Sequence, residues 1–191
     1  MFWKDEGYLL SKNNFDENSI IIEAFTFDHG KYTGIVYGGS SKKQKRNFQV
    51  GNKILLNWKS KNENNRGYFN VELIRPISPF FFDDKKKCVC ILSATSILKM
   101  LLPERQINKK IYNSFENFLE DLKSDDWIKL YVKWELSLIK ELGFEASLKI
   151  NYNDDISKAL TLNRNLLMEN FIIPNRLKFP LFRSILENYF I

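Results

Sequence analysis

The chain has 191 residues, of which 44% are hydrophobic, 27% charged and 15% aromatic. This composition is typical of a globular protein and excludes a disordered or fibrous one, and the length allows one large domain or two small ones. The formal net charge is +6 at neutral pH, so a polyanion is the first partner to consider.

Cysteine and histidine are rare: Cys88, Cys90 and His29 are the whole set. They exclude a disulfide framework and a four-cysteine zinc site, so we expect a reducing compartment, no metal and no cofactor. The charged N-terminus predicts no signal peptide. The uncharged stretch at 88–98 is shorter than the roughly 18 residues of a membrane span. We therefore expect a cytoplasmic protein without a membrane partner or a small-molecule substrate.

The first part of the chain has the pattern of short β-strands. Strands are predicted at 8–11, 19–27, 31–37, 53–61 and 67–75. The segments are rich in β-branched and aromatic residues, and turn-forming residues such as Asp28-His29-Gly30 separate them. Five short strands with glycine-rich turns predict a small antiparallel β-barrel.

The pattern changes at Pro76 and Pro79, which end the strands. After them we expect helices at 88–102, around 111–122, at 126–142, at 156–171 and from 180 to about 189. The sequence therefore predicts an α+β protein, with a β-barrel at 1–78 and an α-helical domain at 79–191.

Positive charge is concentrated between residues 31 and 66. This segment carries a net charge of +8 and the rest of the chain carries −2. Its basic residues are Lys31, Lys42, Lys43, Lys45, Arg46, Lys53, Lys59, Lys61 and Arg66, and its neighbours include Tyr32, Tyr37, Phe48, Trp58, Tyr68 and Phe69. Barrels that bind single-stranded nucleic acid combine cations with aromatic side chains for base stacking, so we predict that the nine basic residues bind a single-stranded nucleic acid. The alternative is that the aromatic residues form the core and the lysines a solvated loop.

No motif predicts catalysis. Cys88 and Cys90 lie in an apolar segment that is expected to be a packed helix. Asp28 and His29 resemble a catalytic pair, but they occupy a predicted hairpin turn and no nucleophile is assigned beside them. Glycine-rich nucleotide-binding motifs are also missing from the sequence. We therefore expect no catalytic residues.

The segment 126–142 predicts a helix that is apolar around most of its circumference. Lys129, Lys133 and Lys140 fall within roughly 40° of one another on it, so they form a narrow cationic stripe. The stripe is either the solvent face of the helix or the edge of a binding site. Together with Trp134, these lysines are the candidate residues for binding a partner.

Five segments carry a family resemblance through their order and spacing. They are MFWKDEGYLLS at the start, IIEAFTFDHGKYTGIVYGGSSK, LLPER, YVKWELSLIKELGF, and MENFIIPNRLKFPLFRSIL near the end. Together they resemble the bacterial DNA repair protein family RecO. The resemblance implies an N-terminal OB-like antiparallel barrel followed by a helical domain.

The resemblance also implies a non-enzymatic recombination mediator. Such a protein binds and anneals single-stranded DNA and acts with RecR to load RecA. It also docks on the acidic C-terminal tail of single-stranded DNA-binding protein, for which the helical domain is the expected site. Double-stranded DNA is a further candidate ligand, and a nucleoid-associated location is expected.

The sequence departs from the family after Phe144. Many members carry an arm at this point, often with four zinc-binding cysteines, whereas here EASLKINYNDD leads directly into a predicted helix. Functions that depend on the arm are therefore in doubt. Two rival interpretations remain: an RNA- or ribosome-associated OB protein, and a small hydrolase or nuclease that uses Asp28 and His29.

The cysteine and histidine content generates a first prediction. Elemental analysis of the purified protein should find no stoichiometric metal, and a chelator should leave the melting temperature unchanged, because His29, Cys88 and Cys90 do not make a four-ligand site. Zinc that survives dialysis in a one-to-one ratio would contradict this expectation.

Overall fold

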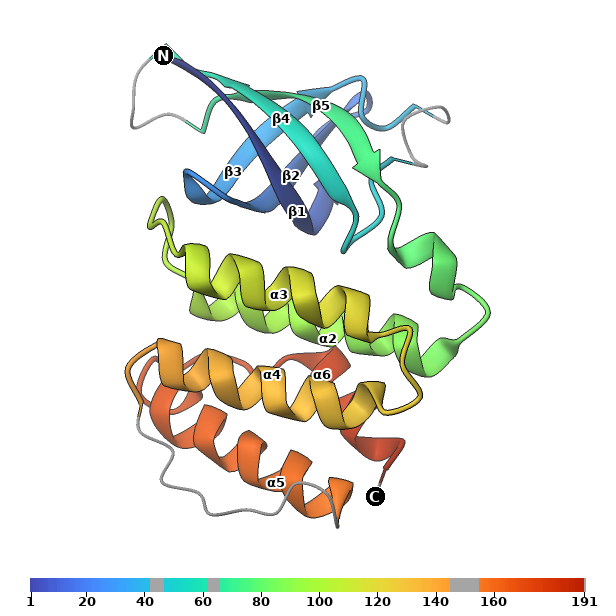
Figure 1. Ribbon diagram of the computed structural model, residues 1–191. Coiled ribbons are helices and arrows are strands. Elements are labelled where there is room, and N and C mark those ends of the chain that lie inside the picture. Colours follow the sequence, from blue (N-terminus) through green and yellow to red (C-terminus); the bar gives the residue numbers. More distant parts are fainter. Residues whose placement is uncertain (42–46, 62–65, 145–154, 191) are drawn as a thin grey trace. The chain divides into compact units, whose positions relative to one another are not determined.

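The computed structural model describes residues 1–41, 47–61, 66–144 and 155–190, which form two compact units, Met1–Lys109 and Lys110–Ile191 (Figure 1). The first unit contains β1 (Phe2–Asn14), β2 (Ser19–Thr26), β3 (Gly30–Tyr37), β4 (Lys53–Lys59), β5 (Tyr68–Arg75), η1 (Ser78–Phe81) and α2 (Lys85–Leu101). The helices that follow are α3 (Lys109–Asp121), α4 (Trp127–Glu141), α5 (Ile156–Leu167), η2 (Met168–Ile172) and α6 (Leu181–Asn188).

The five strands close into a barrel in the order β1-β2-β3-β5-β4. The pairs β1–β2, β2–β3, β1–β4 and β4–β5 are antiparallel, and β3 meets β5 in parallel at Ile35 and Tyr68. This topology, followed by helices, confirms the predicted α+β class with an N-terminal OB-like barrel. Alternate residues of each strand point inward, and the barrel core includes Leu9, Ile22 and Leu56.

Strand β1 is longer than the predicted segment 8–11, because its first residues alternate between a polar outer face and a buried inner face. Lys4 and Glu6 point outward, and their charges interrupt the apolar pattern by which a strand is recognised in the sequence. Asp5, between them, is buried. The buried carboxylate is satisfied at the β2–β3 turn: it accepts the Asp28 backbone N–H at 2.8 Å and contacts Nδ1 of His29 at 2.9 Å.

Helix α2 belongs to the unit that contains the barrel. It packs against β1, and Lys99 on α2 contacts Glu23 on β2 at 2.7 Å. Buried Asn52 joins the barrel to the segment that follows β5, because its Oδ1 accepts the backbone N–H of Ile77 at 2.8 Å. The last strand, β5, ends at Arg75, and the compact units divide between Lys109 and Lys110.

The second unit begins with two helices joined by aromatic packing. Phe118 of α3 stacks on Trp134 of α4 with ring centroids 4.9 Å apart, and Phe115 lies 5.8 Å from the same ring. Gly143 ends α4 at a φ of +95°, the left-handed conformation that glycine adopts at small cost, and this position is the one the sequence predicts.

A buried ionic network joins α4, α5 and α6. Arg183 of α6 has no exposed surface, and its guanidinium donates to both carboxylate oxygens of Glu135 at 2.6 and 3.1 Å. Tyr131 and Asn163 also donate to Glu135. Burial alone would lower the pKa of Arg183, but the charge of Glu135 holds this pKa above its ordinary value. Glu187 accepts from Arg183 as well, so each buried charge has a partner of opposite sign.

Among the described residues, no helix combines the length and the apolar character needed to cross a membrane.

The network predicts a large stability loss for Arg183→Leu. The variant leaves the Glu135 carboxylate buried without its cation, so the free energy of unfolding should fall by about 3–5 kcal/mol in a urea titration. The matched control is Arg164→Leu, which removes a half-exposed partner of Glu187 and should cost about 1 kcal/mol or less. Equal losses in the two variants would contradict the role assigned to burial.

Candidate nucleic-acid interface

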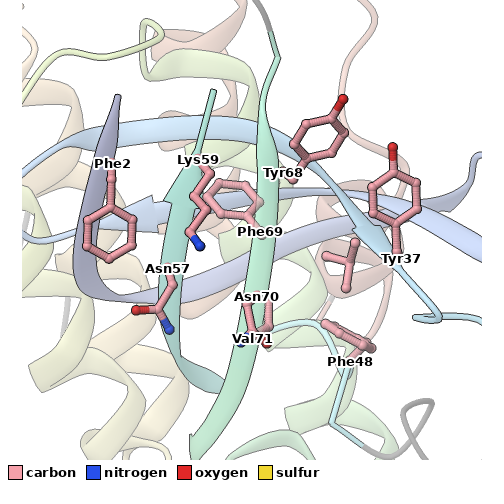
Figure 2. A pocket seen from close by; sticks show the side chains of 10 residues that line it. Phe2, Tyr37, Phe48, Asn57, Lys59, Tyr68, Phe69, Asn70 and Val71 are labelled. Carbon is pink, nitrogen blue, oxygen red and sulfur yellow. The ribbon is translucent and has the colours of Figure 1, made fainter. Parts of the chain in front are cut away.

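Three outward-facing side chains form a straight row across the barrel. Phe2 of β1 is paired in register with Lys59 of β4, which is paired with Tyr68 of β5. Tyr37 of β3 extends the row, because its ring stacks on that of Tyr68 with centroids 5.2 Å apart. Figure 2 shows the four side chains along one surface of the barrel. We call Phe2, Lys59, Tyr68 and Tyr37 the aromatic row.

The rings of the aromatic row are exposed to solvent. The exposed fractions are 62% for Phe2, 64% for Tyr37 and 44% for Tyr68. The Lys59 ammonium lies 5.7 Å from the centre of the Phe2 ring. The row borders a cavity of about 610 Å³ with apolar side chains such as Phe48 in its lining. Exposed rings next to a cation can stack on bases and attract phosphates, which makes this surface a candidate nucleic-acid interface.

A second row of aromatic residues lies directly beneath, on the inner face of the same strands. Trp3, Trp58 and Phe69 are paired in register across β1, β4 and β5. The rings of Trp3 and Trp58 stack at 5.6 Å, and those of Trp3 and Phe69 meet edge to face at 5.9 Å. We call these three the inner row. Because each of its residues adjoins a residue of the aromatic row, the packing inside fixes the positions of the rings outside.

Two glycines allow the inner row to pack closely. A Cβ atom at Gly34 would lie 2.5 Å from the Phe69 ring, and one at Gly67 would lie 2.4 Å from the Trp58 indole nitrogen. Gly67 also has a φ of +68°, in the left-handed region that disfavours other residues. The Trp58 indole N–H donates to the backbone oxygen of Arg66 at 3.2 Å and so links β4 to the residues just before β5.

The stacked tyrosines also interact through their hydroxyl groups. A hydrogen bond to Tyr68 raises the pKa of Tyr37. The two rings form one stacked pair whose hydroxyl groups add a polar edge.

Three of the nine predicted DNA-binding residues lie at this surface. Lys59 is part of the aromatic row, and Lys61 and Arg66 are exposed just beyond it, at the loop end of β4 and β5. Lys61 lines a second cavity, of about 650 Å³, together with Phe2, Lys59 and Tyr68. Lys42, Lys43, Lys45 and Arg46 lie outside the described residues.

The remaining two cations make contacts elsewhere in the described structure. Lys31 is only 8% exposed, because the segment after α2 covers it, and its ammonium donates to the backbone oxygen of Lys99 at 2.7 Å. Burial lowers the pKa of this ammonium. Lys53 stands at the other end of β4 and contacts Glu6 at 2.8 Å. Neither belongs with Lys59 at the aromatic row.

Phe2, Asn57 and Asn70 also face this surface, although they are not among the residues predicted from the sequence. Phe2 precedes the segment predicted as a strand, so its side was undefined. Extending the alternation from buried Leu9 back to the start of the chain would have placed Trp3 inside and Phe2 outside.

Asp28 and His29 are adjacent in the sequence, but their side chains contact different partners. The His29 ring stacks on Trp3 with centroids 4.2 Å apart and contacts Asp5, whereas Asp28 contacts Lys109 at 2.6 Å. In the described part of the chain, no group of three or more His, Cys, Asp and Glu side chains is arranged to hold a metal ion. The turn interpretation of this pair fits its contacts.

The second unit contains a separate groove between α3 and α4, of about 550 Å³. Lys133 and Trp134 line it, with Phe118 and Leu130 as apolar walls and Lys110 as a further cation. The Trp134 ring is 5% exposed and forms part of the core as well as the groove wall. Two of the four predicted partner-binding residues are thus brought together.

The other two predicted residues do not line the groove. Lys129 contacts Asp126 at 2.7 Å, and Lys140 is exposed near the end of α4. Of the three lysines in the predicted cationic stripe, Lys133 is therefore the one that lines the groove in the described structure.

The fold and surface define an OB-like barrel with an exposed aromatic and basic face, joined in the chain to a helical unit. The family described as Recombination protein O N terminal matches residues 1–77, and Recombination protein O C terminal matches residues 83–150. The chain belongs to the RecO family, as the sequence resemblance predicted.

Curated relatives share the printed name DNA repair protein RecO. One from Wolbachia pipientis is 36% identical over 152 residues, which cover 78% of this chain and 61% of the relative. One from Roseobacter denitrificans is 33% identical over 150 residues, covering 78% and 62%. One from Cereibacter sphaeroides is 32% identical over 142 residues, covering 74% and 60%. The matched part of the chain thus spans less than two thirds of the length of these relatives.

Proposed function

We propose that this chain is a DNA repair protein that binds single-stranded DNA and promotes its annealing without catalysis. The observation that carries the proposal is the aromatic row, in which Phe2, Lys59 and Tyr68 are paired in register and the exposed Tyr37 ring stacks on Tyr68. Exposed rings give sequence-tolerant stacking, and Lys61 and Arg66 supply positive charge beside them. The name of the curated relatives supports a role in DNA repair.

The size of the row limits how much of a strand it can hold. Neighbouring strands are about 4.8 Å apart, so the path from Phe2 through Lys59 to Tyr68 is roughly 10 Å long. Tyr37 adds 5.2 Å between ring centres. Such a path accommodates a few stacked bases, within the range of sites found on OB barrels. The proposed ligand is therefore a short single-stranded stretch rather than a duplex.

The helical unit is the proposed site for protein partners. As a mediator, the protein would act with RecR in loading RecA and would dock on the tail of single-stranded DNA-binding protein. An acidic tail that ends in an apolar residue needs an apolar slot with cations at its edge. The groove between α3 and α4 has both, in Phe118, Leu130 and Lys133.

The DNA proposal predicts a change in salt dependence. Replacing Lys59, Lys61 and Arg66 together with Ala should weaken binding to single strands and reduce the slope of log affinity against log salt by about 2, because each phosphate contact contributes about 0.7. Fluorescence anisotropy with a labelled oligonucleotide measures the slope. Lys158→Ala, an exposed lysine on α5, is the control and should leave the slope unchanged. An unchanged slope in a folded triple variant would contradict the proposed surface.

The docking proposal predicts a charge-reversal effect at Lys133. Lys133→Glu should weaken binding of a labelled acidic tail peptide tenfold or more, as expected when a charged contact is lost and repulsion replaces it. Binding to naked single strands should stay unchanged. Lys158→Glu is the matched control, and circular dichroism verifies that both variants fold. Wild-type peptide affinity in Lys133→Glu would move the docking site to another face of the helical unit.

A further inference from the structure

The outer surface of β4 and β5 changes its chemistry in steps along the strands. At the loop end lie the cations Lys61 and Arg66, and next comes the aromatic row. Two residues further along, Asn57 of β4 and Asn70 of β5 are directly paired in register. Figure 2 shows both asparagines on the same stretch of β4 and β5 that carries Lys59 and Tyr68. We call Asn57 and Asn70 the amide pair.

The amide pair is available for a ligand. Asn70 is exposed and Asn57 half-buried, and both line the cavity that the aromatic row borders. No hydrogen bond to either side-chain amide is found among the described residues. Each amide offers two donor hydrogens and one acceptor oxygen, which is the set needed to contact the edge of a nucleobase. Lys4 of β1, opposite Asn57, adds a further donor at the same level.

Negative charge follows beyond the amide pair. The next outward residues are Glu6 of β1, Leu55 of β4 and Glu72 of β5, which are paired in register. Glu6 contacts Lys53, whereas Glu72 is exposed. The Glu72 carboxylate repels phosphates at this level, while Lys61 and Arg66 attract them at the opposite end. The surface therefore favours one orientation of a bound strand, with its backbone toward the loop end.

The spacing suits a base in this orientation. Residues that share a strand face are separated by two steps of about 3.3 Å, so the amide pair lies roughly 6.6 Å from the aromatic row. A base stacked on the row, with its sugar toward Lys61 and Arg66, directs its pairing edge away from the sugar and toward the amides. Unpaired bases are commonly held in this way, stacked on a ring and hydrogen-bonded along an edge.

We propose that Asn57 and Asn70 contact the pairing edges of the bases that stack on the aromatic row. The inference rests on the proposed function, since it requires a single strand at this surface. It assigns separate roles along the strands: cations hold the phosphates, rings hold the base faces, and amides hold the base edges. The bound strand is a ligand of fixed orientation rather than a polyanion held by charge alone.

The test compares two oligonucleotides of equal length, one of thymidine and one with abasic sugars. The double variant Asn57→Ala/Asn70→Ala should bind the thymidine strand about tenfold more weakly than the wild type, as expected for the loss of two neutral hydrogen bonds. It should bind the abasic strand as the wild type does, with the same salt slope. Asn165→Ala/Asn188→Ala, which changes two exposed asparagines of the helical unit, is the matched control.

Each other outcome overturns the inference. Equal losses on both strands would assign the amides to the backbone, and wild-type affinity for the thymidine strand would remove them from the site. Both of these results leave the proposed function standing if the wild type binds the thymidine strand with a salt dependence. A wild type that binds neither strand would overturn the proposed function and this inference together. Circular dichroism confirms the fold of each variant.

Discussion

The packing of Trp3, Trp58 and Phe69 is the constraint on which the barrel surface depends. Strand register is fixed where one face is buried, because a shift of one residue would turn every side chain to the opposite face. Large rings paired across three strands make such a shift especially costly, and they pack so closely against Gly34 and Gly67 that a Cβ atom at either glycine would clash with them. The exposed rings of the aromatic row are aligned because their immediate neighbours are locked inside.

In the helical unit, a buried ionic network connects the last three α-helices. Arg183, Glu135 and Glu187 are buried charges, and α4, α5 and α6 meet around them. Burying ions is expensive unless the geometry satisfies them, so this network defines one arrangement of the three helices rather than adding much net stability. Lys133 lies on α4, two residues before Glu135, so the ionic network also fixes the helix that presents this lysine to its groove.

Much of the fold follows from local patterns in the sequence. Alternation and turn residues identify β2 to β5, and Pro76 and Pro79 mark the change to helices. The C-terminal end of α4 follows from Gly143. The sequence underestimated β1 because charged outer residues interrupt its apolar pattern, and the buried Asp5 is satisfied only by the distant β2–β3 turn.

The candidate site was predictable only in part, because charge along a sequence does not show exposure. Lys31 and Lys59 look alike in the charge map, yet one is covered by a segment more than 70 residues away and the other faces outward. Burial by a segment that is distant in the sequence cannot be recognised from the residues next to the buried side chain. The inward-facing residues of a strand can be recognised from the alternation of apolar and polar residues. Which outward-facing residues lie side by side on neighbouring strands depends on the strand register, which is known only from the structure.

The alternation of β4 has a consequence for how such a protein can evolve. Trp58 and Leu56 are held by the core, whereas Asn57 and Lys59 point away from it. Exposed substitutions that disturb no buried contact usually change stability by about 0.5 kcal/mol or less. The outer positions of this strand can therefore drift while the fold persists, so selection can retune ligand preference on an unchanged scaffold. In this barrel, the buried positions maintain the fold, and the outward-facing positions determine which ligand the surface binds.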